Sequence, residues 1–234
     1  MSFNNQEKKE IVNSVFSSVN QKYDLMNDIL SFGVHRFWKK NLITWMHPQK
    51  GEKLIDVASG TGDLAGYFSK KCNHNCKVYC VEPNKGMFEI GKRKLKKFSN
   101  IKWYLNSAEK LPFEDDSFDY YTISFGIRNV TDINVSISEA LRVLKTGGRF
   151  FCLEFSKVEN EILRMFYKNY SKIIPSIGKF VTGDRNSYAY LVNSINKFHN
   201  QIELKELIEK NGFSNVEYRN LSNGIAAIHT GWKI

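Results

Sequence analysis

The stretch Lys53-Leu-Ile-Asp-Val-Ala-Ser-Gly-Thr-Gly-Asp-Leu64 decides the fold of this chain. It begins with a short apolar run typical of a buried strand, passes through a Gly-Thr-Gly turn and continues with the apolar periodicity of a helix. Gly60 and Gly62 can adopt positive φ and carry no Cβ, so the backbone of this turn can approach a nucleotide-like ligand closely. A Gly-x-Gly turn also occurs as a plain connection between a strand and a helix, and alone it indicates little.

An acidic residue after the next apolar strand strengthens this interpretation. Glu82 directly follows Val78-Tyr-Cys-Val81 and lies twenty residues after Gly62. The tip of the second strand is where ribose hydroxyls are held in doubly wound α/β proteins. The turn and Glu82 together therefore predict a binding site for an adenosine-containing ligand.

The spacing of the glycines favours one kind of adenosine ligand. In the Gly-x-Gly-x-x-Gly pattern that seats a pyrophosphate, the third glycine would stand at position 65, where this chain has Ala65. The chain also has no Gly-Lys-Ser/Thr phosphate loop. A ribose-binding acid without a pyrophosphate cradle favours S-adenosylmethionine over NAD or ATP.

Length and charge limit the kind of protein. The 234 residues suffice for one sizeable core, and the 42% hydrophobic content is typical of globular proteins. The net charge of +10 favours an anionic partner, either a nucleic acid or an acidic membrane surface, unless it reflects only lysines on solvated faces. The basic run at residues 92–97 has no interleaved aromatic residues, which favours a solvated helix face over a nucleic-acid stripe.

No apolar run reaches the length of about eighteen residues that a transmembrane helix requires. The N-terminal residues have neither the apolar core of a signal peptide nor the Arg-rich composition of a presequence. We therefore expect an intracellular or already processed protein.

Four cysteines, at positions 72, 76, 80 and 152, raise the question of a metal site. The first three are separated by three residues each, which is not the x3/x2 spacing of radical enzymes that use an adenosyl cofactor. Cys80 also falls inside a predicted strand. We interpret all four as reduced structural thiols and expect no metal.

Strand and helix patterns alternate from Leu54 onwards, which predicts an α/β fold with a doubly wound, mostly parallel sheet. Residues 8–47 are helical in pattern, which predicts that residues 1–50 form a cap over the sheet, over a substrate or over both. Residues 51–156 form the predicted ligand-binding core. Residues 157–200 are an aromatic, basic helical insertion that either packs as core or lines a hydrophobic tunnel. Residues 201–234 complete the sheet of a single domain. The predicted strands are residues 54–58, 77–82, 101–105, 118–124, 149–154, 214–219 and 224–230.

The chain resembles class I S-adenosylmethionine-dependent methyltransferases in its glycine turn, in Glu82 and in the loops Ser107-Ala-Glu109, Leu111-Pro-Phe113 and Lys145-Thr-Gly-Gly148. Further stretches are similar to signatures of a narrower family, the ubiquinone/menaquinone biosynthesis C-methyltransferases. These stretches are residues 15–19, 22–28, 31–36, 122–132, 153–157, 184–191 and 229–233. The resemblance covers essentially the whole chain and implies a Rossmann-like sheet of seven strands. Two positions depart from the family pattern, since Ser59 stands in place of the usual Gly and Glu82 in place of the usual Asp.

The resemblance also implies which residues contact S-adenosylmethionine. The glycine turn and the tips of the next three strands would provide these contacts. The residues are Gly60, Thr61 and Gly62 in the turn, then Glu82, Ser107, Ala108 and Ser124.

The reaction that the resemblance implies moves a methyl group from the sulfonium of the cofactor to a ring carbon of a polyprenylated benzoquinol or of demethylmenaquinol. An aromatic carbon is a poor nucleophile until a neighbouring hydroxyl, with a pKa of about 10, loses its proton. We expect Arg128 to hold the developing oxyanion and polarise a water, and Asn129 and Tyr23 to position that water or the ring. The alternative role for Arg128 is a structural ion pair with Asp132 or Asp119. Its place at the carboxyl end of a strand favours catalysis.

A polyprenyl tail dissolves only in lipid, so we expect peripheral contact with an anionic membrane. The expected location is the cytoplasmic surface of an inner membrane, or the mitochondrial matrix face. A homodimer or a quinone-synthesis complex is compatible with the sequence, and no nucleic-acid partner is expected. Two other functions stay open at this point: methylation of another small molecule or of a nucleic acid, and a non-catalytic scaffold that binds S-adenosylmethionine.

Overall fold

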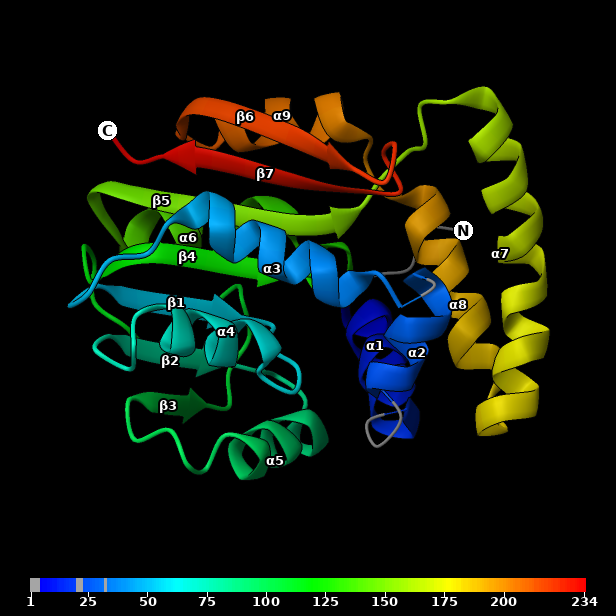
Figure 1. The fold of residues 1–234 in the computed structure, drawn as a ribbon, viewed down its shortest axis with the longest axis horizontal. Helices are drawn as coiled ribbons and strands as arrows, with labels where there is room; N and C mark the ends of the chain where they lie inside the picture. The colour runs from blue at the N-terminus through cyan, green and yellow to red at the C-terminus, as the bar shows by residue number, and fades with distance from the viewer. Residues whose placement is uncertain (1–4, 20–22, 32) are drawn as a thin grey trace.

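A seven-stranded sheet forms the centre of the molecule (Figure 1). The computed structural model describes residues 5–19, 23–31 and 33–234. The strand order is β3-β2-β1-β4-β5-β7-β6, and β7 runs antiparallel to both of its neighbours while the first five strands pair in parallel. This confirms the predicted α/β fold with a mostly parallel sheet of seven strands. The strands are β1 (Lys53–Val57), β2 (Lys77–Val81), β3 (Ile101–Tyr104), β4 (Phe118–Ser124), β5 (Leu144–Phe155), β6 (Ser214–Leu221) and β7 (Ala226–Trp232).

Helices cover both faces of the sheet because successive strand residues point to opposite sides. Leu54 of β1 packs into one hydrophobic cluster with residues of three helices, α3 (His35–Met46), α4 (Asp63–Lys71) and α5 (Lys85–Lys94). The next residue, Ile55, packs into a second cluster with α6 (Ile133–Val143) and α9 (Gln201–Lys210) on the other face. Figure 1 shows α3 and α4 in front of the sheet and α6 and α9 behind it.

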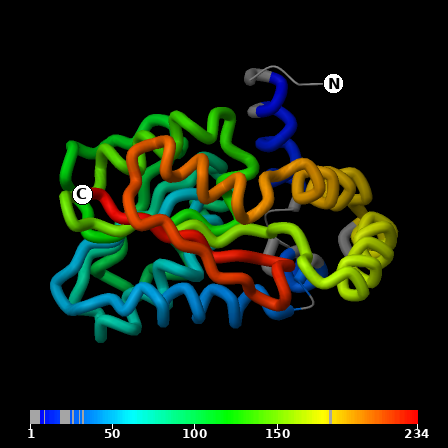
Figure 2. The backbone as a smooth tube through the Cα atoms, turned by 90° about the horizontal axis from the view of Figure 1, so that it is seen from above, coloured from blue at the N-terminus to red at the C-terminus, as the bar shows by residue number. Residues whose placement is uncertain are grey.

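Four further helices gather beyond the carboxyl ends of the parallel strands (Figure 1). They are α1 (Asn5–Val19), α2 (Tyr23–Ser31), α7 (Glu161–Thr182) and α8 (Arg185–Lys197). The last two correspond to the predicted insertion, and α7 is the outermost element at this end of the molecule in both views (Figures 1 and 2).

The sequence between α7 and α8 explains why the insertion forms a helix pair. Gly183 ends α7 with φ 81°, a conformation that glycine adopts without steric cost. Asp184 then caps α8 by accepting a hydrogen bond from the backbone N–H of Ser187. The same carboxylate accepts the hydroxyl of Ser18 at 2.7 Å, which ties α1 to the helix pair.

Candidate active site

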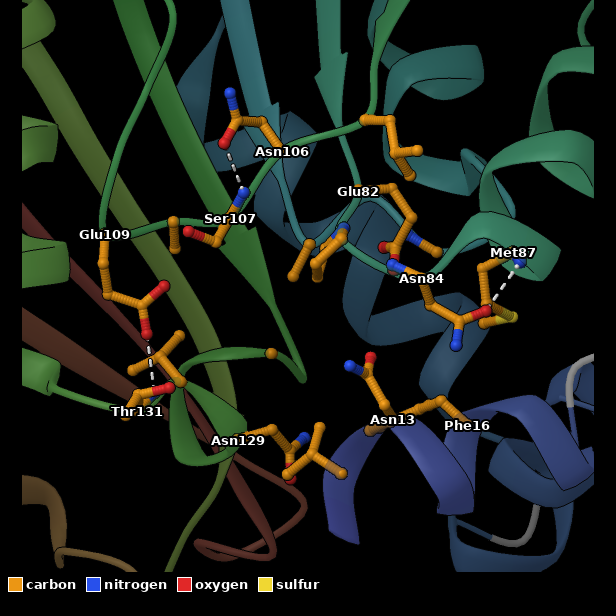
Figure 3. A pocket seen from close by; sticks show the side chains of 18 of the residues that line it. Asn13, Phe16, Glu82, Asn84, Met87, Asn106, Ser107, Glu109, Asn129 and Thr131 are labelled. Carbon is orange, nitrogen blue, oxygen red and sulfur yellow. Dashed lines mark hydrogen bonds between the residues drawn. The ribbon is translucent and has the colours of Figure 1, made fainter. Parts of the chain in front are cut away.

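A cavity of about 810 Å³ opens at the carboxyl ends of the parallel strands (Figure 3). This volume is in the range of pockets that enclose a small-molecule ligand. Its wall contains five of the residues predicted from the sequence, which are Gly60, Glu82, Ser107, Ala108 and Asn129. The remaining lining comes from α1, from the loops that follow β1, β2, β3 and β4, and from the first turns of α5 and α6.

The glycine turn has the backbone conformation that the sequence predicts. Gly60 has φ 57° and Gly62 has φ 84°. Gly62 is also the residue that directly precedes α4. A Cβ at Gly62 would come within 2.6 Å of a methyl group of Leu95, so both conformation and space require glycine there. Ser59, which replaces the usual glycine of the family pattern, does not have positive φ, whereas the preceding Ala58 has φ 50°.

Glu82 joins this turn to the second strand. Its carboxylate accepts hydrogen bonds from the backbone N–H of Gly60 and from that of Asn84, each at 2.9 Å. Burial raises the pKa of Glu82 to about 7, because the two N–H groups only partly compensate for the lost hydration. Each carboxylate oxygen keeps a further lone pair, so ribose hydroxyls can donate to the same group.

Asparagine and glutamate side chains that the sequence reasoning missed shape the rest of the cavity (Figure 3). Asn84 caps α5 by accepting a hydrogen bond from the N–H of Met87 at 3.1 Å. Glu109 accepts from the N–H of Thr131 at 2.6 Å, which fastens the loop after β3 to the loop after β4. The sequence signal for Asn84 was available, since Asn is a common cap at the position directly before the first turn of a helix.

Three other predicted contacts, Thr61, Gly62 and Ser124, do not lie on the cavity wall. Thr61 is buried, and its hydroxyl accepts a hydrogen bond from Lys94 at 3.1 Å. The hydroxyl of Ser124 is buried, and no other group of the described residues bonds to it. Of the glycine turn, Gly60 is therefore the residue that lines the cavity.

Next to the turn, two lysines pair with Asp63 at the start of α4, and of the three side chains only that of Lys94 is exposed. Asp63 accepts from Lys39 at 3.0 Å and from Lys94 at 2.8 Å. Burial alone would raise the pKa of Asp63, but the two lysines outweigh burial and hold this pKa well below its usual range. The network fixes the first turn of α4 and with it the position of Gly62.

Helix α1 closes one side of the cavity, as Figure 3 shows with Asn13 and Phe16 opposite Asn84. The amide of Asn84 donates to the hydroxyl of Ser17 at 3.0 Å. The ammonium group of Lys8 donates to the carbonyl of Val130 at the opposite rim. The predicted N-terminal cap therefore contacts the ligand site itself as well as the sheet.

Arg128 follows the carboxyl end of β4, and its guanidinium forms a buried ion pair. Its guanidinium donates to the carboxylate of Glu154 at 2.6 Å and to the carbonyl of Phe125 at 2.8 Å. Both side chains of the ion pair are almost fully buried, with 3% and 1% of their surface exposed. Arg128 is absent from the cavity wall, while its neighbour Asn129 lies on it.

The predicted alternative partners of Arg128 were wrong. Asp119 pairs with Lys145 at 2.6 Å, and Asp132 caps α6 by accepting from the N–H of Asn134 at 2.9 Å. Glu154 takes their place because β5 lies beside β4 and brings this glutamate next to the end of β4. Burial raises the pKa of Glu154, and Arg128 is the main group that opposes this shift.

Asn129 links the cavity to the helical insertion. Its side-chain oxygen accepts a hydrogen bond from the hydroxyl of Tyr190 on α8 at 3.3 Å. Tyr23 begins α2, but its side chain lies outside the described part of the structure. The catalytic roles assigned to Arg128, Asn129 and Tyr23 stay predictions.

The amino-acid sequence is similar to those of known proteins. The model of the ubiE/COQ5 methyltransferase family matches residues 3–233. The chain belongs to this family. It is 50% identical to the ubiquinone/menaquinone biosynthesis C-methyltransferase UbiE of Rickettsia bellii (strain OSU 85-389), over 97% of this chain and 94% of that protein. It is also 50% identical to the protein of the same name in Brucella anthropi, over 97% of this chain and 89% of that protein.

Solved structures of other methyltransferases have the same fold as this chain. A SAM-dependent methyltransferase of Thermotoga maritima, described as a possible histamine N-methyltransferase, superposes with a TM-score of 0.67. The alignment covers 94% of this chain and 99% of that one at 20% identity. A phosphoethanolamine N-methyltransferase of Haemonchus contortus, solved with S-adenosyl-L-methionine, superposes with a TM-score of 0.63 at 15% identity, over 84% of this chain and 52% of that one. The fold is therefore that of class I methyltransferases.

As a member of the ubiE/COQ5 family, the chain is an enzyme, a C-methyltransferase that uses S-adenosylmethionine, as the resemblance predicted. The cavity fits this co-substrate, because Glu82 presents a carboxylate for the ribose and the turn at Gly60 allows close approach. Gly126 allows the loop after β4 to approach the loop after β1 closely, since a Cβ there would come within 2.5 Å of the Ala58 side chain.

Within residues 5–19, 23–31 and 33–234, no group of three or more His, Cys, Asp or Glu side chains could hold a metal ion. In the same part of the chain, no helix is both long and apolar enough to cross a membrane.

Proposed function

We propose that this enzyme methylates a ring carbon of a polyprenylated quinol, either a benzoquinol or demethylmenaquinol. The observation that carries this proposal is the 50% identity, over nearly the full length, to enzymes named for ubiquinone and menaquinone biosynthesis. Both acceptors have a ring carbon beside a hydroxyl, so one site can serve either.

S-adenosylmethionine supplies an electrophilic methyl group on a positively charged sulfur. When the ring carbon forms its bond to this methyl carbon, the carbon–sulfur bond breaks and sulfur keeps the electron pair. The ring then loses the hydrogen that the methyl replaces and its oxygen regains a proton, so one proton is released in total. Loss of the hydroxyl proton beforehand makes the ring carbon nucleophilic, and the site must stabilise the oxygen that becomes negative.

Asn129 is the polar group best placed to meet that oxygen. Its side chain lies on the cavity wall and is held by Tyr190 and by the carbonyl of Phe125. Arg128 would act through this arrangement, because it anchors the same carbonyl from behind at 2.8 Å. In this proposal Asn129 contacts the acceptor and Arg128 is a positioning residue.

Membrane contact and location belong to the same proposal. A polyprenyl tail partitions into lipid, so the enzyme would collect its acceptor at the surface of a bilayer with anionic headgroups. The net charge of +10 supports such contact. We place the enzyme at the cytoplasmic surface of an inner membrane, or at the corresponding mitochondrial matrix surface, as a homodimer or within a quinone-synthesis complex.

A direct test is methyl transfer from labelled S-adenosylmethionine to short-chain demethylmenaquinol and to the matching benzoquinol, both kept reduced. We expect label in at least one quinol and none in the oxidised quinones, since these have no hydroxyl to deprotonate. A nucleic-acid mixture and a simple catechol serve as competing acceptors. Label only in a competing acceptor, or in none, would contradict the proposal.

A further inference from the structure

The outer face of α7 is apolar although it is exposed. Five large hydrophobic side chains on this helix are exposed, and Phe180 reaches 92% exposure. At about 100° per residue, these five lie within a sector of about 100° around the helix axis. They are Ile162, Met165, Phe166, Ile173 and Phe180.

The side of α7 that packs on the protein is a different one. Ile174 is fully buried, and the hydroxyl of Tyr170 donates to the carbonyl of Ile29 in α2. The apolar outer face therefore does not serve the packing of the helix. Singly scattered surface hydrophobics need no explanation, but five along one face of a single helix do.

Basic residues lie directly beside this face. Arg164, Lys168, Lys172 and Lys179 are exposed and, at about 100° per residue, occupy a neighbouring sector of about 80°. The helix contains one acidic residue, Glu161 in its first turn, which pairs with Arg164 at 3.2 Å, and the three lysines have no acidic neighbour on α7. An exposed apolar stripe with an adjacent Lys/Arg stripe is the pattern of a helix that lies in the interface of an anionic membrane.

We propose that the outer face of α7 docks on an anionic lipid bilayer, with the helix parallel to the membrane plane. This inference rests on the proposed function, for which it names the docking surface. The 22 residues of α7 span about 33 Å, and the helix is the outermost element at its end of the molecule (Figures 1 and 2). The apolar side chains would enter the level of the acyl chains, and the four cations would meet the headgroups.

The charges favour a bilayer over a second copy of this chain. In a two-fold dimer the same surface meets itself, so Lys168, Lys172 and Lys179 of both copies would meet a surface with the same positive charge. The single acidic residue of α7, Glu161, already pairs with Arg164. A bilayer with anionic lipid offers the opposite charge along the whole helix. The α7–α8 pair also connects this surface to the catalytic cavity, because Tyr190 of α8 bonds to Asn129.

The test is flotation of the full chain with vesicles of phosphatidylcholine containing phosphatidylglycerol, and with vesicles of phosphatidylcholine alone. We expect wild-type protein to float with the anionic vesicles at low salt. The double variants Phe166→Ser/Phe180→Ser and Lys168→Gln/Lys172→Gln should each lower the partition coefficient about tenfold or more.

Matched controls change exposed residues of the same kinds elsewhere. Ile202→Ser on α9 and Lys92→Gln/Lys102→Gln on α5 and β3 should float as the wild type does. Wild-type protein that does not float with the anionic vesicles, or α7 variants that float like their controls, would contradict the proposed docking surface. A wild-type dimer in sedimentation velocity that Phe166→Ser/Phe180→Ser dissociates would overturn it too, because self-association would then cover the face.

Activity on a water-soluble short-chain quinol tests the proposed function independently of the docking surface. The α7 double variants should methylate that quinol at the wild-type rate and lose turnover only on a long-chain quinol held in vesicles. If wild-type enzyme methylates no quinol at all, the proposed function fails, whatever the flotation shows. If it methylates the soluble quinol and does not float, only the docking surface fails.

Discussion

The two sides of the catalytic cavity are built on different principles. On the co-substrate side, the carboxylate of Glu82 is held by two backbone N–H groups at the tips of adjacent strands. On the side where we propose that the acceptor binds, Asn129 accepts from a tyrosine of α8 and donates to the carbonyl of Phe125. Arg128, which forms a buried ion pair with Glu154, donates to the same carbonyl. The first side depends on backbone geometry, whereas the second depends on side chains that come from three distant segments.

This difference predicts which side is more sensitive to substitution. Backbone donors stay in place when one side chain changes, so the co-substrate side should lose affinity without losing its shape. A buried ion pair behaves differently, because removal of one partner leaves an uncompensated charge inside the protein. We therefore expect the largest effects on stability at the acceptor side.

Arg128→Met should have the largest effect. We expect it to lower the free energy of unfolding by about 3–5 kcal/mol, because Glu154 stays buried without its cation. Urea denaturation of wild type and variant at several pH values measures this loss. Without Arg128, the folded-state pKa of Glu154 rises further above its unfolded value, so the variant should lose stability as pH rises above that unfolded value and regain it as pH falls.

The double variant Arg128→Met/Glu154→Leu is the control. Since it removes both charges, we expect most of the lost stability to return. Methyl transfer by this stable double variant then distinguishes a catalytic or positioning role of Arg128 from a purely structural role. Activity near that of the wild type would contradict any catalytic or positioning role for Arg128. A single variant as stable as the wild type would contradict the importance of the ion pair.

Glu82→Gln should have the next largest effect, and on binding. The amide can no longer accept from both Gly60 and Asn84, and it is a weaker partner for ribose hydroxyls. Hydrogen bonds to a charged group contribute about 1.5–3 kcal/mol, so we expect about tenfold to a hundredfold weaker binding of S-adenosylmethionine at pH 8. Isothermal titration calorimetry measures the affinity directly.

The pH dependence sharpens this test. Because the pKa of Glu82 is about 7 in the free enzyme, wild-type affinity should fall as pH drops through 7 and the carboxylate becomes protonated. The variant has no such group, so the two affinities should converge in acid. Glu52→Gln is the control, since Glu52 accepts from the N–H of Gln49 away from the cavity. Equal affinities of wild type and Glu82→Gln at pH 8 would disprove the assigned role.

The elements that form the co-substrate side could be predicted because their signals are local, although three of the seven predicted contact residues do not line the cavity. The glycine turn, the residue at the strand tip and the loop at Ser107 each follow directly from the order of apolar runs and turns. The fourth strand was predicted at residues 118–124, as found. The fifth strand was predicted to begin at residue 149, but it starts at Leu144, because Leu144 already pairs with Phe118 of β4. Residues 145–148, which were predicted as a turn, are therefore part of the strand.

The acceptor side could be predicted only in part, since its contacts join segments far apart in the chain. Arg128 and Asn129 were identified at the end of β4, but the ion pair with Glu154 depends on β4 and β5 lying side by side. One signal was present, because a glutamate inside the apolar run Phe150-Phe-Cys-Leu-Glu-Phe155 needs a buried cation. The bond from Tyr190 to Asn129 had no local signal, since the packing of α8 decides it.

Tyr190→Phe should have the smallest effect, and it tests whether the two sides act independently. The variant keeps the ring and removes one hydrogen bond to Asn129, which is 3.3 Å long. A neutral hydrogen bond contributes about 0.5–1.5 kcal/mol, so we expect kcat/KM for the quinol to fall by about twofold to tenfold. The affinity for S-adenosylmethionine should stay unchanged, because Glu82 and the glycine turn make no bond to this tyrosine. Tyr218→Phe on β6 is the matched control. If Tyr190→Phe lowered the affinity for S-adenosylmethionine as much as it lowered quinol turnover, the two sides of the cavity would be coupled.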